Sequence, residues 1–144
     1  MVSLIVMNAM TAKSFLDTNI VLYTIGQDKL KTEVARSLVS AVPFVSAQVI
    51  NECVNVCLRK FSFGKVRAYA FADNVMRRTN VLPLDEAVIR KSAEISVQQQ
   101  ISNWDALIVA AALLANCDIL YSEDMQNGQV FEGGLTVINP FTST

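Results

Sequence analysis

The chain alternates short apolar segments with longer segments of helical periodicity, and this alternation restricts the folds that it can adopt. The short segments have the length of strands and lie at 13–17, 44–46, 81–84, 118–121 and 135–141. Between them lie a brief helix that follows Asn19 and ends at Gly26, and longer helical patterns over 28–40, 46–60, 65–78, 86–99 and 104–116. Strands that alternate with helices favour a parallel sheet covered on both faces. The sequence therefore predicts an α/β fold with four or five short parallel strands.

The length and hydrophobicity of the chain suit one compact unit. It has 144 residues, 52% of them apolar, and a mean hydropathy of +0.36, which is enough for a large core. The first ten residues are apolar and uncharged, but they lack a basic start and are too short to cross a bilayer. We therefore expect one domain over 13–144, a tail over 1–12 outside the fold, and a cytoplasmic protein with no membrane partner.

Neither the net charge nor the cysteines identify a partner. Twelve basic and thirteen acidic residues give a net charge of -1, so any binding to a polyanion must come from a local patch or a metal ion. Three cysteines argue against a disulfide framework and for a reducing compartment. Cys53 and Cys57 suggest half of a zinc site, but only Cys117 is left to add to them, so buried apolar side chains are the favoured interpretation.

Four acidic residues fall where predicted elements begin or end, and the chain contains no histidine. Without imidazole, the common neutral-pH acid–base and Ser-His-Asp routes are closed. The four residues are Asp17, Glu52, Asp105 and Asp124. If the fold gathers them, their mutual repulsion raises their pKa values, and a divalent cation with a preference for oxygen ligands removes that repulsion. The pattern therefore indicates a Mg²⁺ or Mn²⁺ site.

Each acid also has a structural explanation when it is taken alone. Asp17 can cap the helix that follows it, and Asp124 can be an ordinary loop residue. Glu52 can pair with Arg59 or remain solvated at the edge of its helix. Asp105 opens a helix that is apolar almost all round, where free N–H groups and the helix dipole tolerate a carboxylate. These explanations account for the residues singly but not for the set.

Several motifs resemble those of the PIN-domain nucleases, in the same order along the chain. They are FLDTN at 15–19, NE at 51–52, WDALIVAAA at 104–112 and YSEDM at 121–125. The closing GGLTVINPF at 133–141 is similar to the end of the bacterial members, which include the toxins of VapBC toxin–antitoxin modules. The resemblance runs from about residue 14 to residue 141. Each motif is weak by itself, and their common order makes the signal specific.

The resemblance implies a fold, an activity and a set of roles. The fold is a three-layer α/β/α sandwich, and the activity is Mg²⁺- or Mn²⁺-dependent cleavage of RNA by a homodimer that an antitoxin protein restrains. Asp17, Glu52, Asp105 and Asp124 fall on the catalytic and metal-binding acids of the family, and Asn19 and Ser122 fall on its accessory polar positions. The residues after Asp124 are Met, Gln and Asn, where some members have further acids, so a second metal is expected to bind weakly. Of the neighbouring pair Glu123 and Asp124, the later acid matches the family position.

Basic residues near two phenylalanines suggest a contact surface for RNA. Arg59, Lys60, Lys65 and Arg67 cluster around Phe61 and Phe63 in the sequence. Basic groups bind phosphates and aromatic rings stack on unpaired bases. A solvated helix end with core phenylalanines explains the same residues, and the pair Arg77 and Arg78 is a second candidate.

Two other classes of protein fit parts of the pattern. A catalytically silent interaction protein can keep the fold and bind a partner protein or RNA through its surface. A phosphoacceptor of the response-regulator kind also places acids at strand ends, but it requires an acidic pair near the first strand and a lysine after the last. Here Asp17 stands alone on its strand and no lysine follows Lys91, so this class is disfavoured.

Overall fold

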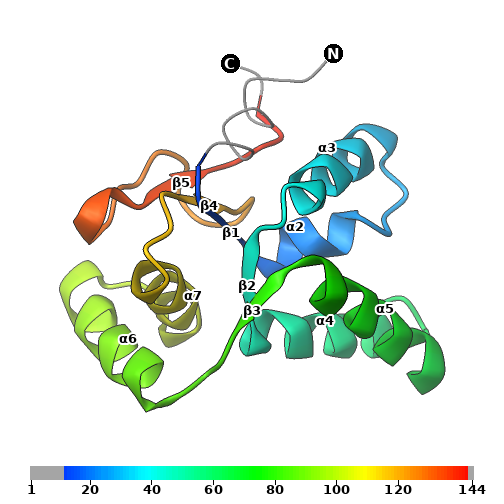
Figure 1. The fold of residues 1–144 in the computed structure, drawn as a ribbon, viewed down its shortest axis with the longest axis horizontal. Helices are drawn as coiled ribbons and strands as arrows, with labels where there is room; N and C mark the ends of the chain where they lie inside the picture. The colour runs from blue at the N-terminus through cyan, green and yellow to red at the C-terminus, as the bar shows by residue number, and fades with distance from the viewer. Residues whose placement is uncertain (1–11, 143–144) are drawn as a thin grey trace.

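The computed structural model describes residues 12–142, and a five-stranded parallel sheet lies at its centre (Figure 1). The strands are β1 (Ser14–Leu16), β2 (Phe44–Ser46), β3 (Asn80–Leu82), β4 (Ile119–Tyr121) and β5 (Thr136–Ile138). Their order across the sheet is β3-β2-β1-β4-β5, and all neighbouring pairs are parallel. The predicted parallel sheet is therefore confirmed, with five strands.

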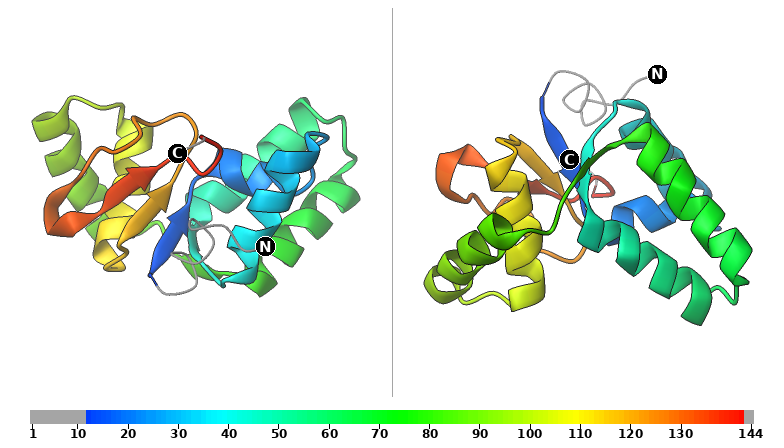
Figure 2. Two further views of the ribbon diagram at one scale, coloured as in Figure 1. Left: turned by 90° about the horizontal axis from the view of Figure 1, so that it is seen from above. Right: turned by 60° about the horizontal axis from the view of Figure 1, so that its bottom comes forward.

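Helices cover the sheet on both sides. They are α2 (Thr18–Tyr23), α3 (Lys29–Ser40), α4 (Ala47–Arg59), α5 (Lys65–Arg78), α6 (Glu86–Gln99) and α7 (Asn103–Leu114), with a short 3-10 turn η1 (Glu132–Gly134) before β5. The two helices α6 and α7 pack together on one side of the sheet, and α2 to α5 lie on the other (Figures 1 and 2). The arrangement is a three-layer α/β/α sandwich, as predicted.

The core forms where the strands meet the helices. The strand residues Phe15, Leu16, Val45, Leu120 and Val137 are fully buried, as expected for parallel strands that are covered on both faces. The predicted all-round apolar helix is α7, in which six of the twelve residues are buried. The three cysteines are free and buried, which agrees with their interpretation as small core residues.

The observed elements are shorter than the predicted ones at several ends. The strand predicted over 13–17 is paired only over Ser14–Leu16, and Asp17 is the N-cap of α2 instead of the last strand residue. Its side chain accepts the N–H of Thr18, so α2 begins at Thr18, earlier than predicted. The last strand ends at Ile138 and not at residue 141. The sequence pattern does not mark these limits, because the apolar runs continue past the point where pairing stops.

The topology places the start of several helices at one edge of the sheet. The central strand β1 lies between β2 and β4, and the chain leaves each strand at the same carboxyl edge. In open parallel sheets, binding crevices form at this edge where the strand order reverses. Ser46 caps α4, and Ser102 caps α7 by accepting the N–H of Asp105 at 3.1 Å. Asp105 therefore lies in the first turn of α7.

The predicted N-terminal tail and the absence of a membrane span are two further expectations from the sequence. Residues 1–11 of the predicted tail lie outside the described residues. Within residues 12–142, no helix has both the length and the hydrophobicity that crossing a bilayer requires.

Candidate active site

Asp17 is held firmly at the carboxyl end of β1. The side chain is only 8% exposed. One oxygen accepts the backbone N–H of Thr18 at 2.7 Å, and the other accepts the hydroxyl of Ser122 at 2.8 Å. Burial raises the pKa of the Asp17 carboxyl above its ordinary value of 3.8, against the effect of these two hydrogen bonds, and the nearby charges of Asp105 and Asp124 raise it further. Asp17 therefore caps a helix and also belongs to an acidic cluster.

Asn19 and Ser122 connect Asp17 to the loop after β4. The Asn19 amide donates to Asp124 Oδ2 at 3.0 Å and lies 3.5 Å from Asp17 Oδ2. The side-chain oxygen Oδ1 of Asn19 accepts the backbone N–H of Glu123 at 3.1 Å. The Ser122 oxygen accepts the backbone N–H of Met125 at 3.2 Å. These two predicted accessory residues therefore position both Asp17 and the segment that carries Asp124.

Glu52 approaches the same cluster from α4. Burial raises the pKa of the Glu52 carboxyl above its ordinary value of 4.5, and the charge of Asp17 raises it further, against hydrogen bonds from Trp104, Thr18 and Gln48. Its Oε1 atom is fully buried. No ion pair to Arg59 forms in the described part of the chain, so the salt-bridge alternative is wrong. Glu52 therefore faces the cluster and not the basic end of its own helix.

Asp105 and Asp124 complete the group. Burial raises the pKa of the Asp105 carboxyl above 3.8, against a hydrogen bond from Ser102, and the charge of Asp124 adds to the rise. Asp124 itself is exposed. Together with Asp17 and Glu52, they place carboxylates from four separate segments at one edge of the sheet. The carboxylates lie close enough for their charges to shift one another's pKa values.

The cluster has the donor chemistry of a divalent-cation site. None of the four acids forms an ion pair with a lysine or arginine among residues 12–142. Oxygen donors without a cationic partner suit Mg²⁺ or Mn²⁺. In the same part of the chain, no three acidic or cysteine side chains are arranged to hold an ion as they stand. The residues therefore fit such an ion in type.

Glu123, the other acid of its pair, is turned away from this cluster. Its carboxylate forms an ion pair with Lys31 at 2.6 Å and accepts the Tyr23 hydroxyl at 2.5 Å. These hydrogen bonds outweigh the opposing effect of burial and lower the pKa of Glu123. The Tyr23 ring packs edge-on against Phe141 at 4.9 Å between centroids. Glu123 thus fastens the β4 loop to α2 and α3.

The two phenylalanines among the predicted RNA-binding residues are neighbours, with ring centroids 6.0 Å apart. Arg67 lies over the ring of Phe63, with 3.8 Å from the guanidinium carbon to the ring centroid. Lys60 and Phe61 line a groove of about 340 Å³ that also includes Asn19. Arg59 and Lys65 are exposed and do not line that groove.

Two residues near the acids escaped the sequence analysis. Thr18 is buried, and its side chain lies against the Glu52 carboxyl and lowers its pKa. The Gln48 amide donates to the backbone oxygen of Trp104 at 3.3 Å, which joins α4, the helix of Glu52, to α7, the helix of Asp105. Thr18 lies inside the FLDTN motif, where its position offered a signal, whereas nothing in the sequence marks Gln48.

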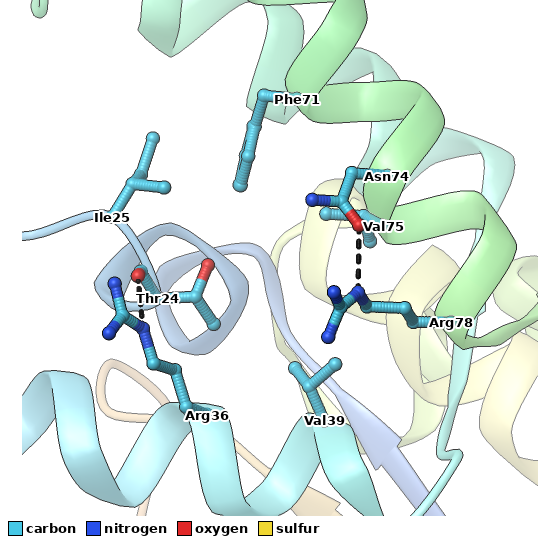
Figure 3. Close-up of a pocket in the computed structure, with 8 residues that line it drawn as sticks. All are labelled: Thr24, Ile25, Arg36, Val39, Phe71, Asn74, Val75 and Arg78. Carbon is cyan, nitrogen blue, oxygen red and sulfur yellow. Dashed lines mark hydrogen bonds between the residues drawn. The ribbon is translucent and has the colours of Figure 1, made fainter.

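A second cavity lies away from the acids, between α3, α5 and the segment after α2 (Figure 3). It has a volume of about 330 Å³. Its apolar surface comes from Ile25, Val39, Phe71 and Val75, and Arg36 and Arg78 lie on either side of it (Figure 3). The Arg36 side chain donates to the backbone oxygen of Thr24 at 3.0 Å, and Arg78 donates to Asn74 at 2.7 Å.

Comparison with known families assigns the class of protein. The family model described as the PIN domain matches residues 14–127. The chain therefore belongs to the PIN-domain family. A search of curated proteins gives no match.

Solved structures of low sequence identity share the fold. A toxin–antitoxin complex from Klebsiella pneumoniae is 17% identical, with a TM-score of 0.66, and the match covers 90% of this chain and 98% of that one. FitAcB from Neisseria gonorrhoeae is 19% identical, with a TM-score of 0.66 and coverage of 89% and 98%. A Mycobacterium tuberculosis VapC toxin, described as cleaving the sarcin–ricin loop, is 18% identical, with a TM-score of 0.64 and coverage of 78% and 90%.

Proposed function

We propose that the chain is a divalent-metal-dependent endoribonuclease and the toxin component of a toxin–antitoxin module. The observation that carries the proposal is the acidic cluster at the carboxyl edge of the sheet. There Asp17, Glu52 and Asp105 have raised pKa values and no cationic partner among the described residues. Membership of the PIN-domain family and the likeness to a toxin described as cleaving the sarcin–ricin loop support the choice of RNA as substrate.

The four acids have proposed roles in binding Mg²⁺ or Mn²⁺. Asp17, Asp105 and Asp124 would hold the ion directly or through water, and Glu52 would complete its shell. When bound, such an ion lowers the pKa of a water molecule and neutralises charge on the phosphoryl oxygens. Hydrolysis is expected to leave 5′-phosphate and 3′-hydroxyl ends.

The surrounding residues hold the acids in place for this role. The Thr18 N–H and the Ser122 hydroxyl fix one oxygen each of Asp17. The Asn19 amide fixes Asp124 relative to Asp17. Partners of this kind set the orientation and basicity of metal ligands. We therefore assign Ser122 and Asn19 as positioning residues.

RNA cleavage with and without Mn²⁺ tests the proposed activity. The native chain is expected to cut RNA only with the metal, and Asp105→Asn is expected to abolish cutting while circular dichroism and melting show an intact fold. Asp73→Asn is the matched control, because Asp73 is an exposed acid on α5 that pairs with Arg77 and with none of the four acids. Full activity of Asp105→Asn, with contaminating nuclease excluded, would contradict the assignment.

The partner is proposed to be an antitoxin protein. Several structural neighbours are themselves toxin–antitoxin or VapBC complexes. The apolar cavity with Arg36 and Arg78 beside it offers a surface for a segment with apolar and acidic side chains. The alternative is a catalytically silent PIN-fold protein that only binds a partner protein or RNA, which tight association without any metal-dependent cleavage would favour.

We further propose that the protein acts as a homodimer in the cytoplasm. The edge strand β3 exposes Val81, which lines an apolar depression with Tyr69 and Met76. An exposed apolar patch at a sheet edge is a common site of association. Light scattering of the purified protein tests this proposal, and a monomeric mass at all concentrations would exclude it.

A further inference from the structure

A groove between α2 and α4 leads away from the candidate active site. It has a volume of about 340 Å³. Its lining comes from α2, from the segment between α2 and α3, and from the end of α4: Asn19, Leu22, Tyr23, Gly26, Gln27, Asp28, Val56, Lys60 and Phe61. Asn19 belongs to both features, because its amide also donates to Asp124 at 3.0 Å. The groove therefore begins at the acidic cluster and extends to the residues that follow α4.

The lining of the groove is largely apolar, and hydrogen bonding and ring packing fix part of it. The Tyr23 ring is fixed by the hydrogen bond of its hydroxyl to Glu123 and by its contact with Phe141. Phe61 is 41% exposed, and its ring lies 6.0 Å from that of Phe63, so part of its surface is free for a ligand. Leu22 and Val56 supply aliphatic surface to the same lining.

A positive charge stands beside this apolar lining. Lys60 is exposed, and it forms no ion pair among the residues that the structure describes. The lining thus combines Asn19, which is bonded to an acid of the cluster, with an apolar part and the cation of Lys60. Its one acid, Asp28, caps α3 and accepts the backbone N–H of Lys31. Single-stranded nucleic acid offers complementary groups, since each flat base is joined to phosphates on both sides.

We infer that this groove binds one unpaired nucleobase next to the cleaved phosphodiester, with Phe61 stacking on the base and Lys60 contacting the neighbouring phosphate. The inference rests on the proposed ribonuclease function and adds a substrate-binding site to it. The volume lies near the lower end of the usual range for small-ligand sites, about 300–1,000 Å³, which suits a base better than a helix. A paired base cannot enter, so the groove selects single-stranded RNA or loops.

Photochemical crosslinking tests the site without depending on cleavage. A single-stranded oligoribonucleotide substituted with thiouridine is irradiated with the Asp105→Asn variant, which leaves the RNA intact, and the crosslinked peptide is identified by mass spectrometry. The expected crosslink is in the segment that contains Phe61, and it disappears in Phe61→Ala. Crosslinks that lie only elsewhere overturn the inference.

Steady-state kinetics provide a second and separate readout. Loss of one stacked base is expected to raise KM for single-stranded RNA about 5- to 150-fold in Phe61→Ala, with kcat little changed. Phe61→Trp keeps a stacking surface and is expected to stay near the native KM. Val97→Ala is the control, because Val97 is an exposed apolar residue on α6 that does not line the groove. An unchanged KM in Phe61→Ala contradicts the inference.

The contribution of Lys60 is measured by the salt dependence of RNA binding. Lys60→Ala should reduce the slope of log affinity against log salt by about 1, the value expected for one lost phosphate contact. Lys29→Ala, in an exposed lysine outside the groove, should leave the slope unchanged. If the two variants show the same slope, Lys60 does not contact a phosphate of the bound RNA.

The outcomes distinguish failure of the proposed base site from failure of the proposed ribonuclease function. If the native chain cuts RNA but Phe61→Ala and Lys60→Ala behave as the controls do, the groove is not the base site and the proposed function stands. If the native chain cuts no RNA with Mn²⁺ yet crosslinks at Phe61, the proposed ribonuclease function fails and the groove remains an RNA-binding site. Absence of both cleavage and crosslinking overturns both.

Discussion

The hydroxyl of Ser122 donates a hydrogen bond of 2.8 Å to Asp17, although 105 positions separate the two residues in the sequence. The contact exists because β1 and β4 are parallel neighbours whose register pairs Leu16 with Tyr121. Residues that directly follow the two strands therefore meet at the carboxyl edge of the sheet. This strand pairing is what places a buried serine against the acid of the FLDTN motif.

Removing this hydroxyl should reduce activity more than stability. Ser122→Ala leaves Asp17 without one of its two strongest hydrogen bonds, so the carboxylate loses its fixed orientation and its pKa rises further. Loss of such a partner to a metal ligand costs about 10- to 100-fold in activity or metal affinity. RNA cleavage rates with Mn²⁺ check this prediction. Ser92→Ala is the control, because it removes a buried serine hydroxyl that bonds only to a helix carbonyl, and it should keep native activity.

The neighbouring acids Glu123 and Asp124 should respond differently to loss of charge. Asp124→Asn removes a carboxylate of the cluster and should abolish metal-dependent cleavage. Glu123→Gln removes an ion pair with Lys31 outside the cluster, so it should lower the melting temperature while cleavage persists. Cleavage assays and thermal melting of the two variants side by side check this. The reverse result, with Glu123→Gln inactive and Asp124→Asn active, would exchange their roles.

The Glu52 carboxylate should lower the free energy of unfolding of the metal-free protein while it supports cleavage. Burial and the charge of Asp17 raise the pKa of this carboxyl, and hydrogen bonds from Trp104, Thr18 and Gln48 offset this only in part. Glu52→Gln removes the charge, so in buffer with EDTA it should increase the free energy of unfolding by about 1 kcal/mol while it reduces cleavage. Urea unfolding measures the change. Glu33→Gln, in an exposed residue of α3, should have no effect, and a destabilised Glu52→Gln would show that the carboxylate is satisfied in the fold.

Stability without added metal should fall as the pH rises through the acidic range. Asp17, Glu52 and Asp105 have folded pKa values above the ordinary 3.8 and 4.5, so the folded state binds more protons than the unfolded state does in this window. The free energy of unfolding therefore decreases from about pH 4 upward. Glu123 acts in the opposite sense because its pKa is lowered.

A comparison of the native chain with Asp17→Asn isolates the contribution of the cluster. Glu123 is common to both proteins, so it cancels in the difference. Unfolding in urea at a series of pH values should show a shallower decrease for the variant. Equal slopes would mean that Asp17 does not carry a raised pKa.

Much of the fold and the identity of the acids could be predicted from the sequence. The α/β alternation, the capping by Ser46 and Asp85 and the position of Asp105 in a first turn all depend on local patterns, which short windows contain. The ends of the strands are harder to predict, because the pairing of a strand stops where its neighbour stops. That limit depends on a segment far away in the chain.

The contacts around the site could not be predicted for the same reason. Glu123 joins Lys31 and Tyr23 across 92 and 100 positions, and no local pattern marks these three residues as partners. The groove likewise combines the first turn of α2 with the end of α4. The sequence predicts one patch around Phe61 and Phe63, and the two rings do lie 6.0 Å apart, with Arg67 over Phe63. That Phe61 also lines the groove depends on the distant α2 and could not be predicted.

Binding of Mn²⁺ at neutral pH, measured by calorimetric titration and by melting, tests most directly whether the four carboxylates form one ion site. The native chain should bind the ion, and its stability should increase by about 2.7 kcal/mol at a hundred times the dissociation constant. EDTA should reverse the increase, and Asp17→Asn should lose both the binding and the stabilisation. A native chain that binds no Mn²⁺ and melts at the same temperature in Mg²⁺, Mn²⁺ and EDTA would contradict the account.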